Sequence, residues 1–534
     1  MFDPVTISRR RVVVGLPLGL AGFGLLSTAT GTFAAGLAGE LDTSFAFGGK
    51  YLSDWGGTST FGPGIALQAN GALVIGGKNK TTTLDQFAAF RLSSSGALDT
   101  SFGVNGLVQA TFGSSIKPAT NDENIKVVTL QFDGKILLGG EGNAGGPGQH
   151  GVMRLNTNGS LDTTFGDRGK VLIDFGRISH VHDIKQQSDG KLLVIGDYYS
   201  GTAGTLALAR LNVNGTLDTS FSTGGKMLKS FGDTTNGHCV TALADGRIVM
   251  SGYVDNTTTG LSSAFFVMRL SANGLIDKSF GTDGSTLVQA GGASPNNNNY
   301  CHWQLVQPDG KIVVFGGSVI NRVGNIAMVR LTADGVLDSS FGTGGIVVTD
   351  FTGTSATTGE EAATGALQTD GKIVAAGYCE GRFMVARYTS SGVLDSTFAT
   401  GGKTFITVGT GGDDFVKSML IQPDGKIAVA GYSKNAGRFT MGVVRLLNDV
   451  TGLPVASSDT ERLFRWAEAK FATYFPPGPT TEVLAGYTLR HYTSTAIYLG
   501  VKDGTVVVYG AVFGGLLSVG LLSELLLQAA RDGY

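Results

Sequence analysis

Short apolar runs recur along most of the chain, each about four to eight residues long and separated by glycine, aspartate or asparagine. Runs of this length that are rich in Val, Ile and Leu indicate β-strands. One group consists of Trp303–Gln307, Lys311–Phe315, Ile326–Leu331 and Ile346–Phe351. The first two runs are joined by Pro308-Asp309-Gly310, which can close a hairpin because glycine accepts positive φ. The pattern therefore predicts repeating units of four strands.

Two sequence words show that this unit occurs seven times. A Leu/Ile-Asp-x-Ser/Thr-Phe word ends at Phe45, Phe102, Phe165, Phe221, Phe280, Phe341 and Phe398. The hairpin word recurs at Asn70-Gly71, Asp133-Gly134, Asp189-Gly190, Asp245-Gly246, Asp309-Gly310, Asp370-Gly371 and Asp424-Gly425. Successive copies lie 54 to 64 residues apart, which is too long for a solenoid coil and suits one propeller blade each.

The phase of the repeat predicts how the ring closes. Leu41–Trp55 has the pattern of a fourth strand, whereas Met441–Leu447 has that of a third strand. We therefore expect Lys50–Trp55 to complete the last blade beside Met441–Leu447, which leaves no free sheet edge. The expected fold is all-β, with a seven-bladed β-propeller over residues 41–450 that is closed by the N-terminal strand.

Residues present in all seven copies are expected to form the framework, because a functional site needs to be made only once. The repeated phenylalanines should fill the space between blades, and the repeated aspartates should hold their own turns. Seven arginines recur in phase and should meet carboxylates or carbonyls between blades. They are Arg91, Arg154, Arg210, Arg269, Arg330, Arg387 and Arg445.

These repeated blocks resemble a known family. LDTSFG, QPDGKIVVFGG and MVRL are similar to the delta-60 repeat, a β-propeller family of secreted and surface proteins of bacteria. The resemblance covers residues 41–450. It implies a propeller outside the cytoplasm, and it implies no established activity and no catalytic residues.

Residues 458–534 have a different pattern, which predicts a small α+β domain. Ser458-Asp459-Thr460-Glu461 is a capping box that opens a helix from Arg462 to about Tyr474. The segments expected to follow are the strands Tyr487–Tyr492, Ala496–Val501 and Thr505–Tyr509 and the helix Leu516–Ala530. This region resembles a small uncharacterised domain found in exported β-proteobacterial proteins.

The first 38 residues are expected to be a signal peptide. Ser8-Arg9-Arg10-Arg11 precedes the apolar run Val12–Leu26, and cleavage is plausible after Ala34, Ala35 or Ala38. The paired arginines resemble a twin-arginine signal, and an ordinary Sec signal is the alternative. Either signal predicts a periplasmic or secreted protein, and the mature chain contains no candidate membrane span.

Composition narrows the classes of partner. The balance of 40 basic and 42 acidic residues argues against nucleic acid as a partner. Only three cysteines are present, so Cys239 and Cys301 could pair and leave Cys379 spare. Three tryptophans are too few for a stacked sugar or quinone platform in every blade.

Candidate site residues share one register. In a propeller, the loops that vary most here lie on one face, and they include residues 114–123, 141–150, 253–263, 290–300 and 351–361. Seven residues before each hairpin turn, the blades carry Pro63, Lys126, His182, His238, His302, Ala363 and Lys417. Half of the six histidines in the chain therefore fall in this register, in three consecutive blades. We expect their side chains to converge at the mouth of the channel.

Three interpretations of this cluster remain open. Neutral imidazoles can bind zinc, copper or iron, with Cys239 or Cys301 as thiolate donors. Alternatively, the histidines together with Lys126 and Lys417 can hold an anion. The third interpretation is that polar residues merely cap strand ends around a wet channel. Candidate second-shell residues, some of them also ligands for calcium, are His180, Asp183, Glu123, Glu360, Glu361 and Asp414.

The function that the sequence favours is an exported ligand-binding or surface-interaction propeller, expected to be monomeric. Its ligand could be a small molecule, a polysaccharide or a protein. One alternative is a metal-assisted hydrolase or lyase that uses the histidine cluster, and another is a structural envelope protein. No G-x-S-x-G, phosphate-loop or H-E-x-x-H motif is present, so the chain is more readily interpreted as a binder than as an enzyme.

Overall fold

The computed structural model describes residues 37–53, 59–81, 85–113, 124–143, 148–201, 203–256, 261–292, 298–320, 323–351 and 360–449, and five strands within residues 480–521. Most of the expected signal peptide, the helix predicted from Arg462 to Tyr474 and the candidate Glu123 lie outside the described residues. None of the described segments forms a helix with the length and hydrophobicity needed to cross a bilayer.

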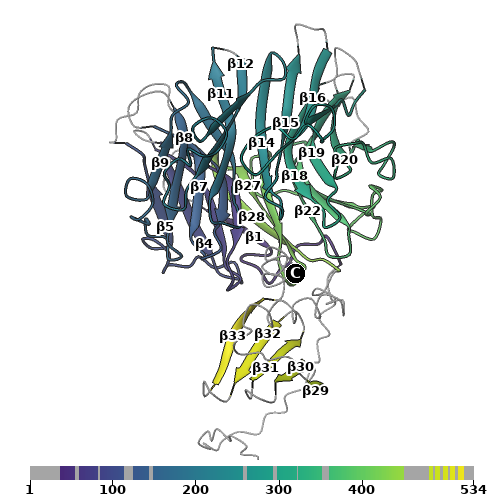
Figure 1. The fold of residues 1–534 in the computed structure, drawn as a ribbon. Coiled ribbons are helices and arrows are strands. Elements are labelled where there is room, and N and C mark those ends of the chain that lie inside the picture. The colour runs from purple at the N-terminus through teal and green to yellow at the C-terminus, as the bar shows by residue number, and fades with distance from the viewer. Residues whose placement is uncertain are drawn as a thin grey trace, which may run out of the picture. The chain divides into compact units, whose positions relative to one another are not determined.

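Seven four-stranded antiparallel sheets form the propeller (Figure 1). Blade 1 comprises β2 (Ser59–Leu67), β3 (Leu73–Lys80), β4 (Asp85–Leu92) and β5 (Leu107–Ala110). Blade 2 comprises β6 (Asn124–Leu130), β7 (Ile136–Gly142), β8 (Gln149–Leu155) and β9 (Lys170–Ile173). Blade 3 comprises β10 (Ser179–Gln186), β11 (Leu192–Ser200), β12 (Ala203–Leu211) and β13 (Lys226–Lys229). Blade 4 comprises β14 (Thr234–Ala242), β15 (Ile248–Asn256), β16 (Leu261–Leu270) and β17 (Ser285–Val288).

The remaining blades follow the same order. Blade 5 comprises β18 (Asn298–Val306), β19 (Ile312–Ile320), β20 (Val323–Leu331) and β21 (Ile346–Thr349). Blade 6 comprises β22 (Glu360–Leu367), β23 (Ile373–Cys379), β24 (Arg382–Tyr388) and β25 (Lys403–Ile406). Blade 7 comprises β26 (Asp414–Ile421), β27 (Ile427–Asn435), β28 (Arg438–Leu446) and, from the other end of the chain, β1 (Lys50–Leu52).

Ring closure confirms the expected phase. β1 pairs with β28 in antiparallel register, with Tyr51 opposite Val443. The first strands of neighbouring blades contact one another in the closed cycle β2, β6, β10, β14, β18, β22, β26 and back to β2. These first strands therefore surround the central axis, and the seven-bladed fold is confirmed.

The repeated arginine, aspartate and phenylalanine form the expected framework. In blade 5, Arg330 Nε lies 2.8 Å from Asp338 Oδ2, and its guanidinium carbon lies 4.4 Å from the centre of the Phe341 ring. Arg330 Nη1 also donates to the carbonyl of Ser390 in the next blade, at 2.6 Å. Asp338 Oδ1 accepts from the backbone N–H of Ser340, which holds the turn. The Arg–Asp pair and the fully buried phenylalanine recur in all seven blades.

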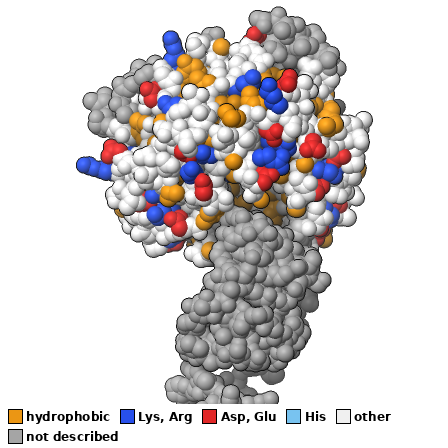
Figure 2. All heavy atoms as spheres, viewed as in Figure 1, with side chains coloured by type: hydrophobic (Ala, Val, Ile, Leu, Met, Phe, Trp, Pro, Cys, Tyr) orange, Lys and Arg blue, Asp and Glu red, His pale blue; other side chains and the backbone are white. Residues whose placement is uncertain are grey.

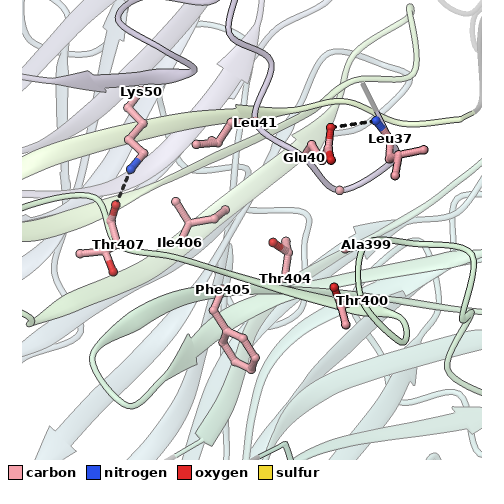
Figure 3. A pocket seen from close by; sticks show the side chains of 11 residues that line it. Leu37, Glu40, Leu41, Lys50, Ala399, Thr400, Thr404, Phe405, Ile406 and Thr407 are labelled. Carbon is pink, nitrogen blue, oxygen red and sulfur yellow. Dashed lines mark hydrogen bonds between the residues drawn. The ribbon is translucent and has the colours of Figure 1, made fainter. Parts of the chain in front are cut away.

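A groove of about 410 Å³ marks the junction where the N-terminal segment meets β25 (Figure 3). Ala399 N–H donates to the carbonyl of Ala38 at 2.8 Å, and Lys50 Nζ donates to the carbonyl of Thr407 at 2.7 Å. The Glu40 carboxylate accepts from the backbone N–H of Leu37. Both charged side chains that line the groove thus already have hydrogen-bond partners, which gives this junction a structural role.

The C-terminal strands form one five-stranded antiparallel sheet. They are β29 (Thr480–Leu484), β30 (Tyr487–Tyr492), β31 (Ile497–Lys502), β32 (Thr505–Gly510) and β33 (Gly515–Leu521). The three predicted strands correspond to β30, β31 and β32. Residues 515–521, at the start of the helix predicted over Leu516–Ala530, form β33 and pair with β32. Apolar runs of this length fit a helix or a strand equally well, so periodicity alone did not decide between them.

Candidate ligand site in the central channel

A β-bulge explains why the candidate residues share a register. In each blade the pairing of the first two strands shifts by one residue or more at the same place, for example between Val181 and Asp183 and between Gly237 and Cys239. The residues at the shift are Pro63, Lys126, His182, His238, His302, Ala363 and Lys417. A bulged residue has no partner in the ladder and its side chain is re-aimed. The register found in the sequence is therefore a ring of bulge residues around the channel.

The bulge also requires a glycine opposite it on the second strand. The second strand carries Gly196, Gly252, Gly316, Gly377 or Gly431 where the first strand bulges. A Cβ placed on Gly316 would lie 1.9 Å from the carbonyl oxygen of Tyr300, and the other four would approach the equivalent carbonyl about as closely. No side chain fits at that distance. The glycine six residues after the glycine of each of these hairpin turns is therefore the sequence signature of the bulge.

The three histidine side chains converge, as expected. The rings of His182 and His238 stack with centroids 4.4 Å apart and planes 13° apart. The rings of His238 and His302 lie 5.3 Å apart at an angle of 43°. The bulges in three consecutive blades thus assemble a column of imidazoles.

Carboxylates hold the outer members of this column. His182 Nε2 lies 2.6 Å from Asp197 Oδ2, and His302 Nε2 lies 3.0 Å from Glu361 Oε1. Burial raises the pKa of the Glu361 carboxyl, but the charge of His302 and its hydrogen bond outweigh that effect and the net pKa is lowered. Among the described residues, no carboxylate forms such a contact with His238. Burial, followed by the charges of His182 and His302, lowers its pKa well below the usual value, so His238 is neutral at neutral pH.

Two lysines on the other side of the ring complete a cationic lining. Lys126 and Lys417 line a channel cavity of about 280 Å³ together with His182, Lys185 and Trp303. None of the described residues that line this cavity is acidic. Burial, followed by the charge of Lys417, lowers the pKa of Lys126, and burial likewise lowers that of Lys417. By contrast, acidic and basic side chains are interspersed on the outer face seen in Figure 2.

Metal coordination fits the present ring orientations poorly. Donor atoms of His182, Asp197 and His238 lie within 4.8 Å of one another, which is close enough for a metal site. A metal ion must lie in the plane of each imidazole that binds it, about 2.0–2.1 Å from the nitrogen. The rings of His182 and His238 are stacked and nearly parallel, so one ion cannot lie in both planes. One ring would have to rotate, and the metal-ligand role of these histidines stays a prediction.

The two candidate thiolates lie away from the histidine rings. Cys239 and Cys301 are buried and are not joined by a disulfide. Cys239 Sγ donates to the backbone carbonyl of His302 at 3.3 Å, and Cys301 Sγ lies 3.7 Å from Ser251 Oγ. Burial raises the pKa of the Cys301 thiol to about 12 and that of Cys239 well above its usual value. Both groups are therefore protonated, which does not suit metal donors.

Most of the candidate second-shell carboxylates belong to the framework. Asp183 is buried and accepts hydrogen bonds from the backbone N–H groups of Ile184 and Val240. Glu360 accepts from the N–H of Phe351, and Asp414 accepts from that of Val408. In blade 4, the position equivalent to Glu360 and Asp414 holds Thr235, which accepts a hydrogen bond from the N–H of Phe231. The side chain at this position therefore fixes the loop that leads into the blade.

Glu361 and His180, two of the predicted supporting residues, do face the channel mouth. Other charged residues there were not predicted from the sequence. Glu361 meets His302, and His180 Nε2 lies 3.2 Å from Glu141 Oε2. Asp197 and Glu141 were not predicted, although each directly follows the glycine opposite the bulge. The same position holds Tyr253, Tyr378 and Tyr432, so the word Gly-Tyr recurs in blades 4, 6 and 7. Comparison of the residues after that glycine could have found this second layer.

Fold and site together define a propeller made of sequence repeats. A family model described as "Domain of unknown function (DUF5122) beta-propeller" matches residues 131–165, 187–221, 243–280, 307–341, 368–398 and 422–449. Each matched segment begins near a hairpin turn and all but the last end near the phenylalanine of the next word. Over these six segments the chain is therefore similar to a family of β-propeller repeats.

Solved structures resemble the chain at low sequence identity. A virginiamycin B lyase from Staphylococcus aureus is 9% identical with a TM-score of 0.41, over 74% of this chain and 98% of the lyase. The polysaccharide lyase Uly1 is 12% identical with a TM-score of 0.44, over 78% of this chain and 94% of that protein. Drosophila Semaphorin 2a is 8% identical with a TM-score of 0.43, over 81% of this chain and 78% of that protein. No curated protein matches the sequence.

Proposed function

We propose that this protein is an exported ligand-binding propeller that holds a small anionic ligand in its central channel. The observation that carries the proposal is the pair Lys126 and Lys417. Both ammonium groups enter one cavity, and neither forms an ion pair with a carboxylate of a described residue. The two ammonium groups repel each other, and an anion placed between them would remove that repulsion.

The rest of the channel supports an anionic ligand. His182 and His302 are oriented by carboxylates, and His238 between them can accept a proton when an anion enters. Lys185 Nζ also lines the cavity and lies 5.2 Å from the centre of the Trp303 ring, but it is paired with Asp183 at 3.0 Å. Export is supported by Ser8-Arg9-Arg10-Arg11 and the apolar run that follows it.

Calorimetric titration of the purified chain tests the proposal. The probes are inorganic phosphate, citrate and a hexuronate, with uncharged galactose as the neutral comparison. At least one anion should bind, and Lys417→Gln should weaken that binding about tenfold or more, because a charge-assisted hydrogen bond contributes about 1.5–3 kcal/mol. Lys278→Gln removes an exposed lysine of another blade segment and should leave the affinity unchanged.

Two results would overturn the proposal: no probe binds, or Lys278→Gln weakens binding as much as Lys417→Gln does. The unfolding temperature must be measured on the same samples. We expect Lys417→Gln to unfold at the same temperature as the parent or higher, because it removes a charge that lacks a partner.

A metal-assisted hydrolase or lyase is the second candidate, favoured by the proximity of donor atoms on His182, Asp197 and His238. Elemental analysis of the purified protein separates the two. One equivalent of zinc, copper or iron that disappears in His238→Ala would favour the metal site, whereas anion binding by metal-free protein would favour the first proposal.

A further inference from the structure

Aromatic side chains form an arc at the channel mouth, one layer beyond the bulge residues. The rings of Tyr253 and Tyr300 pack edge to face with centroids 5.2 Å apart. Those of Tyr378 and Phe415 lie 5.0 Å apart, and those of Phe415 and Tyr432 lie 5.1 Å apart. All five side chains are partly exposed. The arc thus offers apolar surface to a molecule in the channel mouth.

This arc adjoins the cationic ring directly. The ring of Tyr253 lies 5.4 Å from that of His238, and Lys417 Nζ lies 5.8 Å from the centre of the Tyr432 ring. Tyr378 is hydrogen-bonded to Glu361, the carboxylate that holds His302. A ligand whose charge lies between the lysines would therefore place its body against tyrosine rings.

Hydrogen-bond acceptors are interspersed with the rings. Tyr199 Oη lies 3.4 Å from both Asp197 Oδ2 and Asn236 Oδ1. Asp197 and Asn236 are buried, whereas the side chain of Glu361 is partly exposed and can accept a hydrogen bond from a hydroxyl. The tyrosine hydroxyls can donate or accept, and a sugar presents hydroxyls at its edge and C–H bonds on its face.

The cavity lined by Lys126 and Lys417 limits the charged end of the ligand, because no aromatic residue of the arc lines it. Its volume of about 280 Å³ is roughly nine times the share of liquid volume that one water occupies, about 30 Å³. That space is large enough for a carboxylate, and the rest of a single sugar ring would extend from it toward the tyrosines.

We infer that the anionic ligand is an acidic sugar, with its carboxylate between Lys126 and Lys417 and its ring against the tyrosine arc. This inference rests on the proposed function and names its ligand class. The lysines would recognise the charge, the tyrosines would recognise the ring, and Glu361 would recognise a hydroxyl.

Titration with matched probes tests this inference. D-galacturonate, D-glucuronate and D-mannuronate carry both charge and ring, D-galactose carries only the ring, citrate carries only charge, and benzoate is a flat aromatic acid. At least one hexuronate should bind more tightly than the other three probes. Tyr432→Leu should weaken hexuronate binding about three- to tenfold and leave citrate unaffected, while Tyr432→Phe should retain it.

Tyr198→Leu is the matched control, because residue 198 points to the opposite face of β11 from Asp197 and Tyr199 and should leave hexuronate binding unchanged. If citrate binds as tightly as every hexuronate and Tyr432→Leu has no effect, the acidic-sugar inference fails while anion binding stands. Tighter binding of benzoate would replace it with an aromatic acid. If no anion binds at all, the proposed function fails and the inference with it.

Discussion

The Arg–Asp–Phe framework and the channel differ in which side chains the seven repeats carry. The arginine, aspartate and phenylalanine of the framework are kept in all seven blades, and each arginine pairs with its aspartate. The bulge position has the same backbone register in all seven blades but carries proline, lysine, histidine or alanine. A repeated backbone with unrepeated side chains is how a symmetric frame acquires one asymmetric site.

The two regions also differ in how their charges are neutralised. Each framework arginine has a carboxylate within 2.8 Å, and Asp338 receives a further contact from Lys311 at 3.3 Å. In the channel, Lys126 and Lys417 have no carboxylate of their own among the described residues. The framework arginines therefore have carboxylates in direct contact, whereas Lys126 and Lys417 feel carboxylate charges only through longer-range effects of Asp197, Glu141 and Glu361.

A substitution in the Arg–Asp–Phe framework should cause the largest loss of stability. Arg330→Ala would leave the nearly buried Asp338 carboxylate with Lys311 as its one remaining cationic partner among the described residues. It would also remove the contacts with the Ser390 carbonyl and the Phe341 ring. Removing one partner of a buried ion pair costs about 3–5 kcal/mol. We expect a loss of this size in the free energy of unfolding, measured by urea denaturation.

Measuring the ligand affinity of Arg330→Ala tests whether the framework and the channel are independent. Below its unfolding transition, Arg330→Ala should bind anions as the parent does, because the channel lies at the first strands. A loss below about 1 kcal/mol would place this pair among weak surface ion pairs and contradict its framework role.

Much of the framework was predictable because it repeats. Phe45, for example, is recognised as a plug by comparison with six other copies, and the closure by Lys50–Leu52 follows from the phase of the repeat. The bulge was not predicted, because a shift in strand pairing does not change the pattern of apolar residues. The sequence showed only that the seven residues share one register. The roles of Asp183 and Glu360 were misjudged because a carboxylate near a site looks the same in sequence whether it faces a channel or backbone N–H groups.

A rise in pH should next weaken anion binding in the channel. The pKa of Lys126 lies below its ordinary value of 10.5, and so does that of Lys417. Anion affinity should therefore fall as the pH rises through these lowered values, before an ordinary lysine loses its charge. Calorimetric titration of a bound anion across this range measures the fall.

Stability should change in the opposite direction. Because the folded state releases these protons at lower pH than the unfolded state, the contribution of the two lysines to the free energy of unfolding rises with pH over the same interval. In the double variant Lys126→Gln and Lys417→Gln, both dependences should flatten. An affinity that is constant up to the ordinary lysine pKa would show that these ammonium groups do not hold the anion.

The smallest expected effect concerns where the framework begins. Ala38 is buried in the core between blades 6 and 7, and its carbonyl accepts a hydrogen bond from the N–H of Ala399. Signal cleavage after Ala38 would remove these contacts and place a charged amino group at Gly39, whose N–H donates to the carbonyl of Leu447. We therefore expect the exported protein to be cut after Ala34 or Ala35, so that Leu37 and Ala38 remain on the mature chain. The intact mass of protein recovered from the periplasm or medium distinguishes these sites, and a mature chain that starts at Gly39 would show that the first blade contacts are dispensable for closure.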